Sequence, residues 1–363
     1  MKKEVRLMKG NEVIAEAAIR CGADAYFGYP ITPQSEVMET LMELEPWKTT
    51  GMVVLQAESE VSAINMVYGG GSCGKKVLTS SSSPGVSLMS EGLSYLAGAE
   101  VPCVIVNVTR GGPGLGTIQP AQSDYFQATK GGAHGDFHLL VLAPNSVQEM
   151  HDHVFDAFEL AFKYRNPVMI LTDGVIGQMM EKVVLSEQKP RMTNEEIAKK
   201  YNDWALTGKS ADREMHVITS LEMDPIRQEK FNQKLFSKYD VVKEKEVRYE
   251  EYMTEDAEFI IVAFGSAARI CTRTVDMARE DGFKVGLIRP ITLYPFPSKV
   301  LSDLADRGVR GFLTAELNMG QMVEDVRLAV NGKAPVEHYG RAGGAVFSPG
   351  EVYEQLRVKT IKK

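Results

Sequence analysis

The chain of 363 residues is about the length of two ordinary domains. Hydrophobic residues make up 44% and charged residues 25% of it, a globular composition that excludes a disordered chain, a collagen and a disulfide scaffold. The formal net charge is −7, and nucleic acid binding needs clustered Lys and Arg, so we expect no nucleic acid partner. No apolar run of about eighteen residues occurs, so we expect no membrane span.

The cysteines and histidines are not spaced like ligands of a metal or an iron–sulfur cluster. The four cysteines are separated by about thirty residues or more: Cys21, Cys73, Cys103 and Cys271. Such sites use closely spaced thiolates, for example C-x-x-C, so we expect free thiols in a reducing cytoplasm and no cluster on this chain. Four histidines lie close together in the sequence: His134, His138, His151 and His153. They flank an expected strand and lie in an expected helix, and they form no recognised ligand spacing, so we expect no bound metal.

Short apolar runs alternate with amphipathic segments along residues 1–186. The runs expected to form strands are 25–29, 52–56, 76–80, 103–108, 138–143 and 167–172. The segments with helical periodicity lie near 11–21, 34–45, 58–69, 86–98 and 146–163. The expected strands are continuous runs rich in β-branched residues, and each is followed by a helix. This pattern indicates a parallel sheet that is covered by helices on both faces. We therefore predict a doubly wound α/β domain, whose ligands bind at the carboxyl ends of its strands.

The composition changes after this first domain. Residues 187–256 are rich in Lys, Glu and Asp, with one exposed helix expected from Pro225 onward. We interpret this segment as an arm that packs on one domain or on a partner. Residues 257–363 return to the alternation, with strands expected at FIIVAFG, KVGLIRP, RGFLTAELN and VEHYG, and helices from Ala267, Pro297 and Gly320. They predict a second, smaller α/β domain.

Two loops of the first domain carry polar side chains where a strand is expected to end. Pro30 and Pro33 restrain the backbone of one loop, which presents the Thr32 hydroxyl; Thr32 can equally be an ordinary helix cap. The other loop begins at Arg110 and continues as Gly-Gly-Pro-Gly-Leu-Gly. Its guanidinium and flexible backbone suit a carboxylate or phosphate ligand. The alternative is a mobile surface loop with a solvated arginine.

Two glutamates stand at the start of an expected helix. The helix would have one otherwise apolar stripe, made of Glu60, Ala63, Ile64 and Val67. Glu58 falls outside this stripe, so Glu60 is the glutamate predicted to be buried. A buried carboxylate needs a partner or a raised pKa. The alternative is a glutamate in a first helical turn that interacts only with the helix dipole.

Several distinctive motifs occur in order along nearly the whole chain: YPITPQSE, ESEVSA, SSSPG, RGGPGLGTIQPAQSDYFQATKGG, FGS, RPITLYPFP and AELNMGQM. Together they resemble the α subunit of a 2-oxoacid:ferredoxin oxidoreductase. The Gly-Pro-Gly-Leu-Gly loop with the downstream GDFH is most similar to the 2-oxoisovalerate (3-methyl-2-oxobutanoate) members, and the 2-oxoglutarate members have a similar loop. The resemblance implies oxidative decarboxylation of a 2-oxoacid to its acyl-CoA, with electrons passed to ferredoxin.

The resemblance also implies an active site shared between subunits. Residues 1–186 correspond to the pyrimidine-binding domain of a thiamine-diphosphate enzyme, and residues 257–363 to a transketolase-C-terminal-like domain. In this family a β subunit holds the diphosphate and Mg²⁺ through a Gly-Asp-Gly motif, which this sequence lacks. The resemblance places 4Fe-4S clusters on partner subunits, and it implies possible γ and ferredoxin-like δ subunits together with ferredoxin and coenzyme A.

Particular residues match family positions with assigned roles. Glu60 corresponds to the carboxylate that bonds N1′ of the cofactor's aminopyrimidine, with Pro30 and Ile31 as further cofactor contacts. Thr32 and Arg110 correspond to the positions that hold the carboxylate of the 2-oxoacid. Two other classes of function compete with this reading. One is a self-contained transketolase-like transferase, which the missing Gly-Asp-Gly motif disfavours, and the other is a non-catalytic scaffold subunit.

Overall fold

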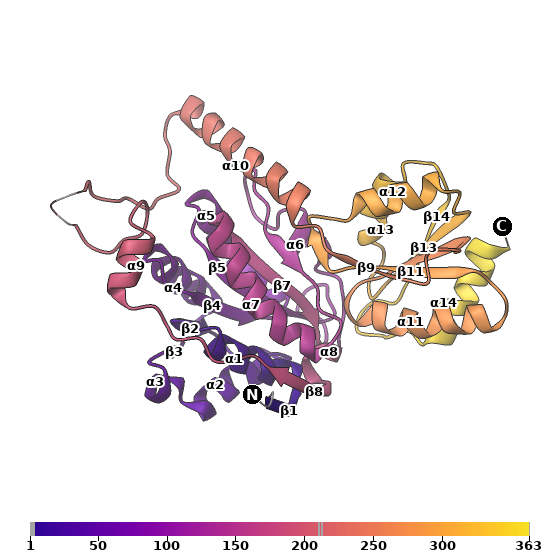
Figure 1. Ribbon diagram of the computed structural model, residues 1–363, viewed down its shortest axis with the longest axis horizontal. Coiled ribbons are helices and arrows are strands. Elements are labelled where there is room, and N and C mark those ends of the chain that lie inside the picture. Colours follow the sequence, from indigo (N-terminus) through magenta and orange to yellow (C-terminus); the bar gives the residue numbers. More distant parts are fainter. Residues whose placement is uncertain (1–3, 210, 212, 363) are drawn as a thin grey trace.

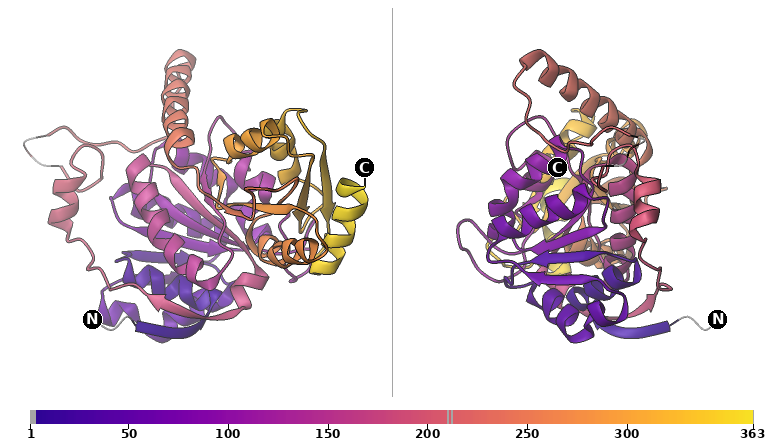
Figure 2. Two further views of the ribbon diagram at one scale, coloured as in Figure 1. Left: turned by 45° about the vertical axis from the view of Figure 1, so that its right-hand side comes forward. Right: turned by 90° about the vertical axis from the view of Figure 1, so that its left-hand side faces the viewer.

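The computed structural model describes residues 4–209, 211 and 213–362. Two sheets of mainly parallel strands lie side by side, and a long helix of the connecting segment projects beside them (Figure 1). Helices cover both faces of the larger sheet (Figure 2). The predicted α/β class, with a doubly wound sheet and a smaller second one, is therefore confirmed. Residues 4–186 are called the N-terminal unit below, and residues 257–362 the C-terminal unit.

Seven strands form the larger sheet, in the order β12-β6-β7-β5-β4-β2-β3. Their bounds are β2 (Ala25–Gly28), β3 (Val53–Gln56), β4 (Val77–Ser81), β5 (Cys103–Thr109), β6 (Leu140–Leu142), β7 (Pro167–Asp173) and β12 (Thr292–Tyr294). All neighbours are parallel except β12, which pairs antiparallel with β6. The central strands β5 and β7 are buried along their whole length, which explains their nearly continuous apolar sequences.

The helices of the N-terminal unit include all those expected from the sequence, within a few residues. They are α1 (Gly10–Arg20), α2 (Ser35–Leu44), α3 (Pro46–Thr49), α4 (Glu60–Ser72), α5 (Pro84–Gly98), α6 (Tyr125–Thr129), α7 (Val147–Tyr164) and α8 (Gly174–Gln178). α1 packs against α7, and α4 packs against α5. Side-chain caps fix the starts of α4, α7 and α8, because Ser59 accepts a hydrogen bond from Ser62 N, Ser146 accepts one from Glu149 N and Asp173 accepts one from Val175 N.

A two-stranded sheet lies outside the sequence prediction. β1 (Glu4–Lys9) pairs antiparallel with β8 (Met180–Leu185), which follows it at the other end of the N-terminal unit. Most side chains of β1 are exposed, and charged residues alternate with apolar ones along the strand. This alternation is a strand pattern, but in β1 the apolar side chains of Val5 and Leu7 are exposed as well, so the strand is held mainly by its pairing with β8.

The connecting segment, residues 187–256, contributes to both the surface and the second sheet. It contains α9 (Asn194–Lys200), α10 (Pro225–Lys245) and β9 (Tyr249–Tyr252). α10 is the helix expected from Pro225, and it projects from the body of the protein (Figure 1). Three buried side chains anchor its C-terminal half: Leu235, Tyr239 and Val242. The boundaries at residues 186 and 256 stay a prediction, since β9 joins the second sheet.

The second sheet has the order β14-β13-β10-β11-β9. Its other elements are β10 (Phe259–Val262), α11 (Gly265–Glu280), β11 (Val285–Pro290), α12 (Ser298–Asp306), β13 (Gly311–Glu316), α13 (Met322–Val330), β14 (Val336–Gly340), α14 (Pro349–Leu356) and a π-helix, η1 (Arg357–Ile361). One continuous cluster of buried apolar side chains extends from the first sheet to α12 and α13. Since β12 also extends the first sheet, the two units share both a core and a sheet.

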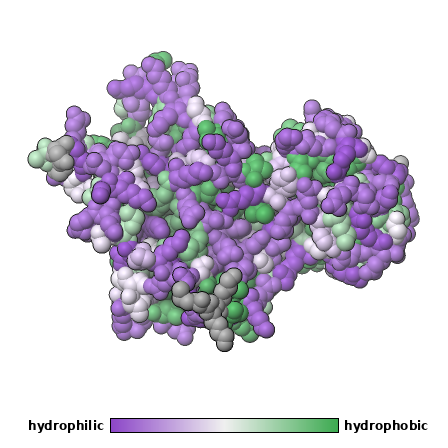
Figure 3. All heavy atoms as spheres, in the orientation of Figure 1, coloured by the Kyte–Doolittle hydropathy of each residue, from purple (hydrophilic) through white to green (hydrophobic). Residues whose placement is uncertain are grey.

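The visible surface is mostly hydrophilic, with apolar residues scattered over it (Figure 3). Among the exposed apolar side chains are Val53 and Leu55 of β3, which are 48% and 40% exposed. β3 is an edge strand, and edge strands with exposed apolar side chains are sites where another chain can bind. Within the described ranges no helix is both long and apolar enough to cross a membrane.

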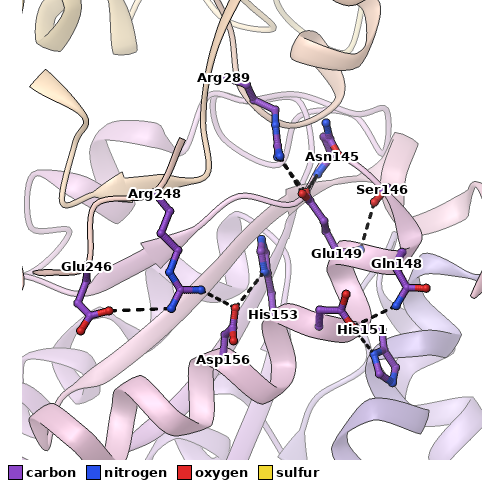
Figure 4. Close-up of polar contacts among 11 residues, drawn as sticks. Asn145, Ser146, Gln148, Glu149, His151, His153, Asp156, Glu246, Arg248 and Arg289 are labelled. Atoms are coloured by element: carbon purple, nitrogen blue, oxygen red, sulfur yellow. Dashed lines mark hydrogen bonds and ion pairs between the residues drawn. The ribbon is translucent and has the colours of Figure 1, made fainter. Parts of the chain in front are cut away.

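A buried arginine connects the two units. Arg289 of β11 is 2% exposed, and its guanidinium forms two hydrogen bonds with the Glu149 carboxylate of α7, at 2.9 and 2.7 Å (Figure 4). Its Nε donates to Glu250 at 2.8 Å. Nearby, Arg248 pairs with Asp156 at 2.6 Å (Figure 4). Two carboxylates, those of Glu149 and Glu250, therefore balance the buried positive charge of Arg289. Removing one of them would leave this charge only partly balanced.

We predict that Glu149→Gln, which keeps the side-chain volume and removes the charge, lowers the free energy of unfolding by about 2–3 kcal/mol. The reason is that Arg289 stays buried with only Glu250 as an anionic partner. Glu280→Gln serves as the control, because Glu280 and its partner Arg273 are both more than half exposed, and such pairs contribute less than about 1 kcal/mol. Equilibrium denaturation in urea, followed by circular dichroism, measures both. Equal losses for the two variants would contradict the assigned role of Arg289.

Candidate functional site

Four neighbouring strands, β5, β4, β2 and β3, run parallel and end at the same edge of the first sheet. The residues that follow them include Arg110 after β5, segment 82–85 after β4, Thr32 after β2 and Glu60 after β3. Because parallel strands bring their carboxyl ends together, these residues share one region although they are far apart in the sequence. The structure therefore gathers the three predicted residues and one segment that the residue-by-residue analysis did not single out.

Glu60 is the first residue of α4, directly after the cap residue Ser59. It is 5% exposed and lies on a stripe with three other buried residues, Ala63, Ile64 and Val67. Glu58 is exposed, so the prediction that Glu60 and not Glu58 is buried is confirmed. Within the described part of the chain, the Glu60 carboxylate has neither a hydrogen bond nor an ion pair. A buried carboxylate without a protein partner is rare and is typical of a place where a ligand binds.

The start of α5 lies against the Glu60 side chain. A Cβ atom at Gly85 would lie 2.6 Å from Glu60 Oε1 and would overlap the Ser81 hydroxyl. Only glycine therefore allows α5 to approach the carboxylate so closely. The hydroxyl oxygens of Ser81 and Ser82 are buried and have no hydrogen-bond partner in the described ranges. One carboxylate and two hydroxyl oxygens thus lie at the start of α5 without a hydrogen-bond partner in the described ranges.

Arg110 lies at the end of β5 and is 8% exposed. Its Nη1 donates to the backbone oxygen of Thr32 at 2.9 Å, and its Nη2 donates to the backbone oxygen of Leu115 at 3.2 Å. Nε is buried and has no partner among the described residues. A guanidinium has five N–H groups, of which two are used here, so one N–H on each of Nη1 and Nη2 remains for a ligand in addition to the buried Nε–H. The predicted neighbourhood of Arg110 and Thr32 is found, but Arg110 also holds its own loop in place.

A buried glutamine holds the Thr32 loop in place. Gln34 is fully buried, donates from its backbone N to Ile31 O at 3.0 Å, and accepts a hydrogen bond from the Ser80 hydroxyl of β4 at 2.6 Å. Thr32 and Pro30 are exposed and Ile31 is half-buried, so all three remain accessible to a ligand. The Thr32 hydroxyl forms no hydrogen bond within the described ranges.

Segment 83–85 connects the Glu60 side of the site to the Arg110 side. The Ser83 hydroxyl accepts a hydrogen bond from Arg110 N at 3.1 Å and donates to Arg110 O at 3.3 Å, while Gly85 contacts Glu60. In the sequence these residues, SSSPG, stand out only as one of the motifs that resemble the family. Three serines followed by Pro-Gly have no periodicity that indicates a binding site. The one feature of the sequence that could have indicated these residues is their position directly after an apolar run.

Asp124 is a further polar residue that the sequence analysis missed. Its carboxylate accepts a hydrogen bond from Asn107 Nδ2 at 2.9 Å. Burial raises the pKa of Asp124, while hydrogen bonds from Ser83 and Asn107 act in the opposite direction. Asp124 lies between β5 and α6 in a stretch where polar and apolar residues follow no helical or strand period, so the sequence does not indicate a role for it.

Other groups of polar residues do not add to this site. A cavity of about 800 Å³ is lined by residues of β12, α12 and the end of α10, and Glu60, Thr32 and Arg110 do not line it. Within the ranges that the structure describes, no three His, Cys, Asp or Glu side chains come together as a metal site. The edge formed by β5, β4, β2 and β3 is therefore the candidate site.

Two family models match the chain. The model described as "Pyruvate flavodoxin/ferredoxin oxidoreductase, thiamine diP-bdg" matches residues 16–258, and "Pyruvate:ferredoxin oxidoreductase core domain II" matches residues 257–352. Ketoisovalerate oxidoreductase subunit VorB of Methanothermobacter marburgensis is 48% identical to this chain, with 97% of each covered. 2-Oxoglutarate synthase subunit KorA of the same organism is 34% identical, over 97% of this chain and 98% of the relative.

Solved structures give the same result. The 2-oxoglutarate:ferredoxin oxidoreductase from Magnetococcus marinus, with 2-oxoglutarate, coenzyme A and succinyl-CoA bound, matches 98% of this chain with a TM-score of 0.86 and 26% identity. This chain covers 65% of the length of that one. A split-gene transketolase shares the fold, with a TM-score of 0.59 at 13% identity over 96% of this chain and 97% of the other. The chain therefore belongs to the 2-oxoacid:ferredoxin oxidoreductase family, and residues 16–258 match its thiamine-diphosphate-binding region.

Proposed function

We propose that this chain is the α subunit of a 2-oxoacid:ferredoxin oxidoreductase and provides the pyrimidine-binding half of its thiamine diphosphate site. The reaction is the oxidative decarboxylation of a 2-oxoacid to its acyl-CoA, with 3-methyl-2-oxobutanoate (ketoisovalerate) as preferred substrate and ferredoxin as electron acceptor. One observation carries the proposal. The Glu60 carboxylate is buried at the carboxyl end of the parallel sheet and has no partner in the described chain.

The residues around Glu60 fit the pyrimidine ring of the cofactor. Glu60 offers an anionic acceptor, Ser81 and Ser82 offer two unpartnered hydroxyls, and Gly85 leaves the approach free of a Cβ atom. When bound, thiamine diphosphate supplies a nucleophilic carbon and takes up the electron pair left when CO₂ departs. Glu60 then holds a proton at a ring nitrogen, and its burial strengthens that bond because water does not compete. The exposed Pro30 and half-buried Ile31 are the proposed further contacts.

Arg110 and Thr32 are the proposed binding groups for the substrate carboxylate. The three unused N–H groups of Arg110 and the free Thr32 hydroxyl are the donors that a carboxylate accepts from. Hydrogen bonds between a guanidinium and a carboxylate are charge-assisted and stronger than neutral ones. Since the loop is already held by Leu115 O and Thr32 O, the guanidinium does not need to reorganise when the substrate binds.

The choice of a branched-chain substrate rests on relatives and on the Arg110 loop, defined as residues 110–119. The two Methanothermobacter subunits named for ketoisovalerate are 47–48% identical to this chain, and those named for 2-oxoglutarate synthase are 33–34% identical. On the loop, Leu115 is 83% and Ile118 is 59% exposed. Apolar side chains there favour an isopropyl group over a second carboxylate, which would need a cation. 2-Oxoglutarate is the alternative substrate.

The proposal assigns the rest of the active site to partners. The sequence has no Gly-Asp-Gly motif, so we propose that a β subunit holds the diphosphate and Mg²⁺. We propose that partner subunits, γ and ferredoxin-like δ chains among them, hold the 4Fe-4S clusters. Coenzyme A and ferredoxin are further proposed partners of the complex. The exposed Val53 and Leu55 of edge strand β3 are available for such a contact. The four cysteines are free thiols, which supports the proposed location in the reducing cytoplasm.

A single experiment separates this proposal from its competitors. The chain is co-expressed with the neighbouring β subunit, and the purified complex is assayed with a panel of 2-oxoacids and a viologen dye as electron acceptor. We expect dye reduction that depends on coenzyme A and is fastest with 3-methyl-2-oxobutanoate. Ketol transfer by the chain alone, which is redox-neutral and reduces no dye, would indicate a transketolase-like transferase, and a complex without any activity would indicate a scaffold.

We predict that Glu60→Gln slows hydrogen exchange at C2 of the bound cofactor by about 10²–10⁴-fold, because an amide cannot hold the proton that the carboxylate holds. Glu58→Gln, two residues earlier on the exposed side of the helix start, is the matched control and should leave exchange nearly unchanged. Deuterium exchange in the reconstituted αβ complex, read by NMR after acid quenching, measures both. The assignment moves to Glu58 if only the control variant is slow.

We predict that Arg110→Lys raises the KM for the 2-oxoacid about ten- to a hundredfold, since a lysine keeps the charge but cannot form the same forked hydrogen bonds. Thr32→Val removes one neutral hydrogen bond and should raise KM by roughly two- to tenfold. Steady-state assays of both variants against the wild-type complex provide the comparison. Unchanged KM and kcat in the lysine variant would place Arg110 outside the substrate site.

We predict that the chain without its β subunit binds thiamine diphosphate weakly. It contributes the pyrimidine wall, whereas Mg²⁺ bound through carboxylates and diphosphate oxygens anchors the other end of the cofactor. Isothermal titration calorimetry of the chain alone, with and without Mg²⁺, tests this. Low-micromolar binding that depends on Mg²⁺ would rule out a site divided between two subunits.

A further inference from the structure

The C-terminal unit is bonded to the stretch of chain that follows the Arg110 loop. Gln122, between β5 and α6, is 2% exposed and directs all of its polar groups to that unit. Its backbone N donates to Leu317 O at 2.9 Å, and its backbone O accepts from Asn318 Nδ2 at 2.8 Å. Its side-chain amide donates to Phe264 O at 2.9 Å and accepts from Leu317 N at 3.1 Å.

The turn of the C-terminal unit that bonds Gln122, residues 316–322, is held in place by buried hydrogen bonds. Glu316 at the end of β13 is fully buried and accepts hydrogen bonds from Asn318 Nδ2 at 3.0 Å and Met322 N at 2.7 Å. A second contact lies beside it, where Gln321 Nε2 donates to Ser123 O at 2.7 Å. The C-terminal unit therefore offers a fixed surface, and residues 122 and 123 cannot move relative to it without breaking buried hydrogen bonds.

A short series of hydrogen bonds leads from this contact back to Arg110. Asp124, two residues after Gln122, accepts from Asn107 Nδ2 at 2.9 Å, and Asn107 Oδ1 accepts from Ser83 N at 3.1 Å. The Ser83 hydroxyl bonds both the N–H and the C=O of Arg110. The backbone from which the guanidinium extends is thus held by residues that are tied to the C-terminal unit.

A separate contact joins the C-terminal unit directly to the Arg110 loop. The Thr117 hydroxyl donates to Gly343 O at 3.3 Å. Gly344 has φ +95°, and a Cβ atom there would overlap the Cβ of Gln119. The turn at 343–344 therefore needs glycine both for its backbone conformation and for its close approach to the loop.

We infer that the C-terminal unit positions the substrate-binding arginine, and that Gln122 is the positioning residue through which it acts. The inference rests on the proposed function, in which Arg110 binds the carboxylate of a 2-oxoacid. Glu60 stands on α4 against α5 and forms no hydrogen bond with the described part of the C-terminal unit. Loosening the contact at Gln122 should therefore affect substrate binding and leave the cofactor side of the site unchanged.

The test uses the αβ complex with Gln122→Met, which keeps the side-chain length and removes the amide. We expect the KM for the 2-oxoacid to rise about ten- to a hundredfold, since small displacements of a binding group have effects of this size, with kcat little changed. Hydrogen exchange at C2 of the bound cofactor should stay at the wild-type rate. Gln127→Met is the matched control, because Gln127 bonds Ser87 within the N-terminal unit; its KM should be unchanged.

Gly344→Ala tests the same inference from the other contact, at a half-buried turn whose close approach to the Arg110 loop an added Cβ atom would disturb. It should also raise KM and leave C2 exchange unchanged. If both variants keep the wild-type KM, or if C2 exchange slows as much as KM rises, the contact has no specific role in positioning Arg110 and the inference is wrong.

A readout without substrate separates this inference from the proposed function. In Gln122→Met, backbone amides of residues 107–119 should exchange with deuterium at least about tenfold faster, and those of residues 60–72 at the wild-type rate, as judged by mass spectrometry. A wild-type complex that turns over no 2-oxoacid would overturn the proposed function alone, while this exchange pattern would still support the mechanical link. Equal exchange in wild type and variant would overturn the link.

Discussion

The parallel pairing of β5, β4, β2 and β3 is the constraint on which the site depends. Each of these strands enters the sheet in the same direction, so the residues after all four emerge at one edge. Strands β4 and β5 are buried along their whole length, so a ligand can reach only their carboxyl ends and the segments that follow. Any polar function of the N-terminal unit must therefore be carried by the segments beyond the strand ends, where Thr32, Glu60 and Arg110 are found.

Within that edge the two sides of the site have opposite electrostatic characters. Glu60 is a buried anion without a partner in the described chain, a state that is costly unless a ligand or another subunit compensates it. Arg110 is a buried cation whose guanidinium is partly satisfied by two backbone oxygens. The first therefore favours a ligand that brings a hydrogen-bond donor, and the second a ligand that brings a carboxylate.

The two units are more closely connected than their separate sheets suggest. β12 leaves the C-terminal unit to pair with β6, β9 enters the second sheet from the connecting segment, and Arg289 bonds Glu149 across the boundary. A shared core reinforces these contacts. Such an arrangement resists independent motion of the two units, because separating them would expose apolar surface and break a buried ion pair. Because the two units resist independent motion, the C-terminal unit can hold Gln122 in a fixed position.

The sequence by itself determined the local elements and one chemical distinction. Alternation of apolar runs with helical stripes located the main strands and helices of both sheets, though not β9 or β12. The stripe of α4 separated buried Glu60 from exposed Glu58, because periodicity reports which face of an element is buried. Only the tertiary structure decided which distant segments meet. The pairing of β1 with β8, the place of β12 in the first sheet and the bonds of Gln122 with Leu317 and Asn318 join residues far apart in the chain. Their partners are chosen by the packing of the whole molecule, which no local pattern encodes.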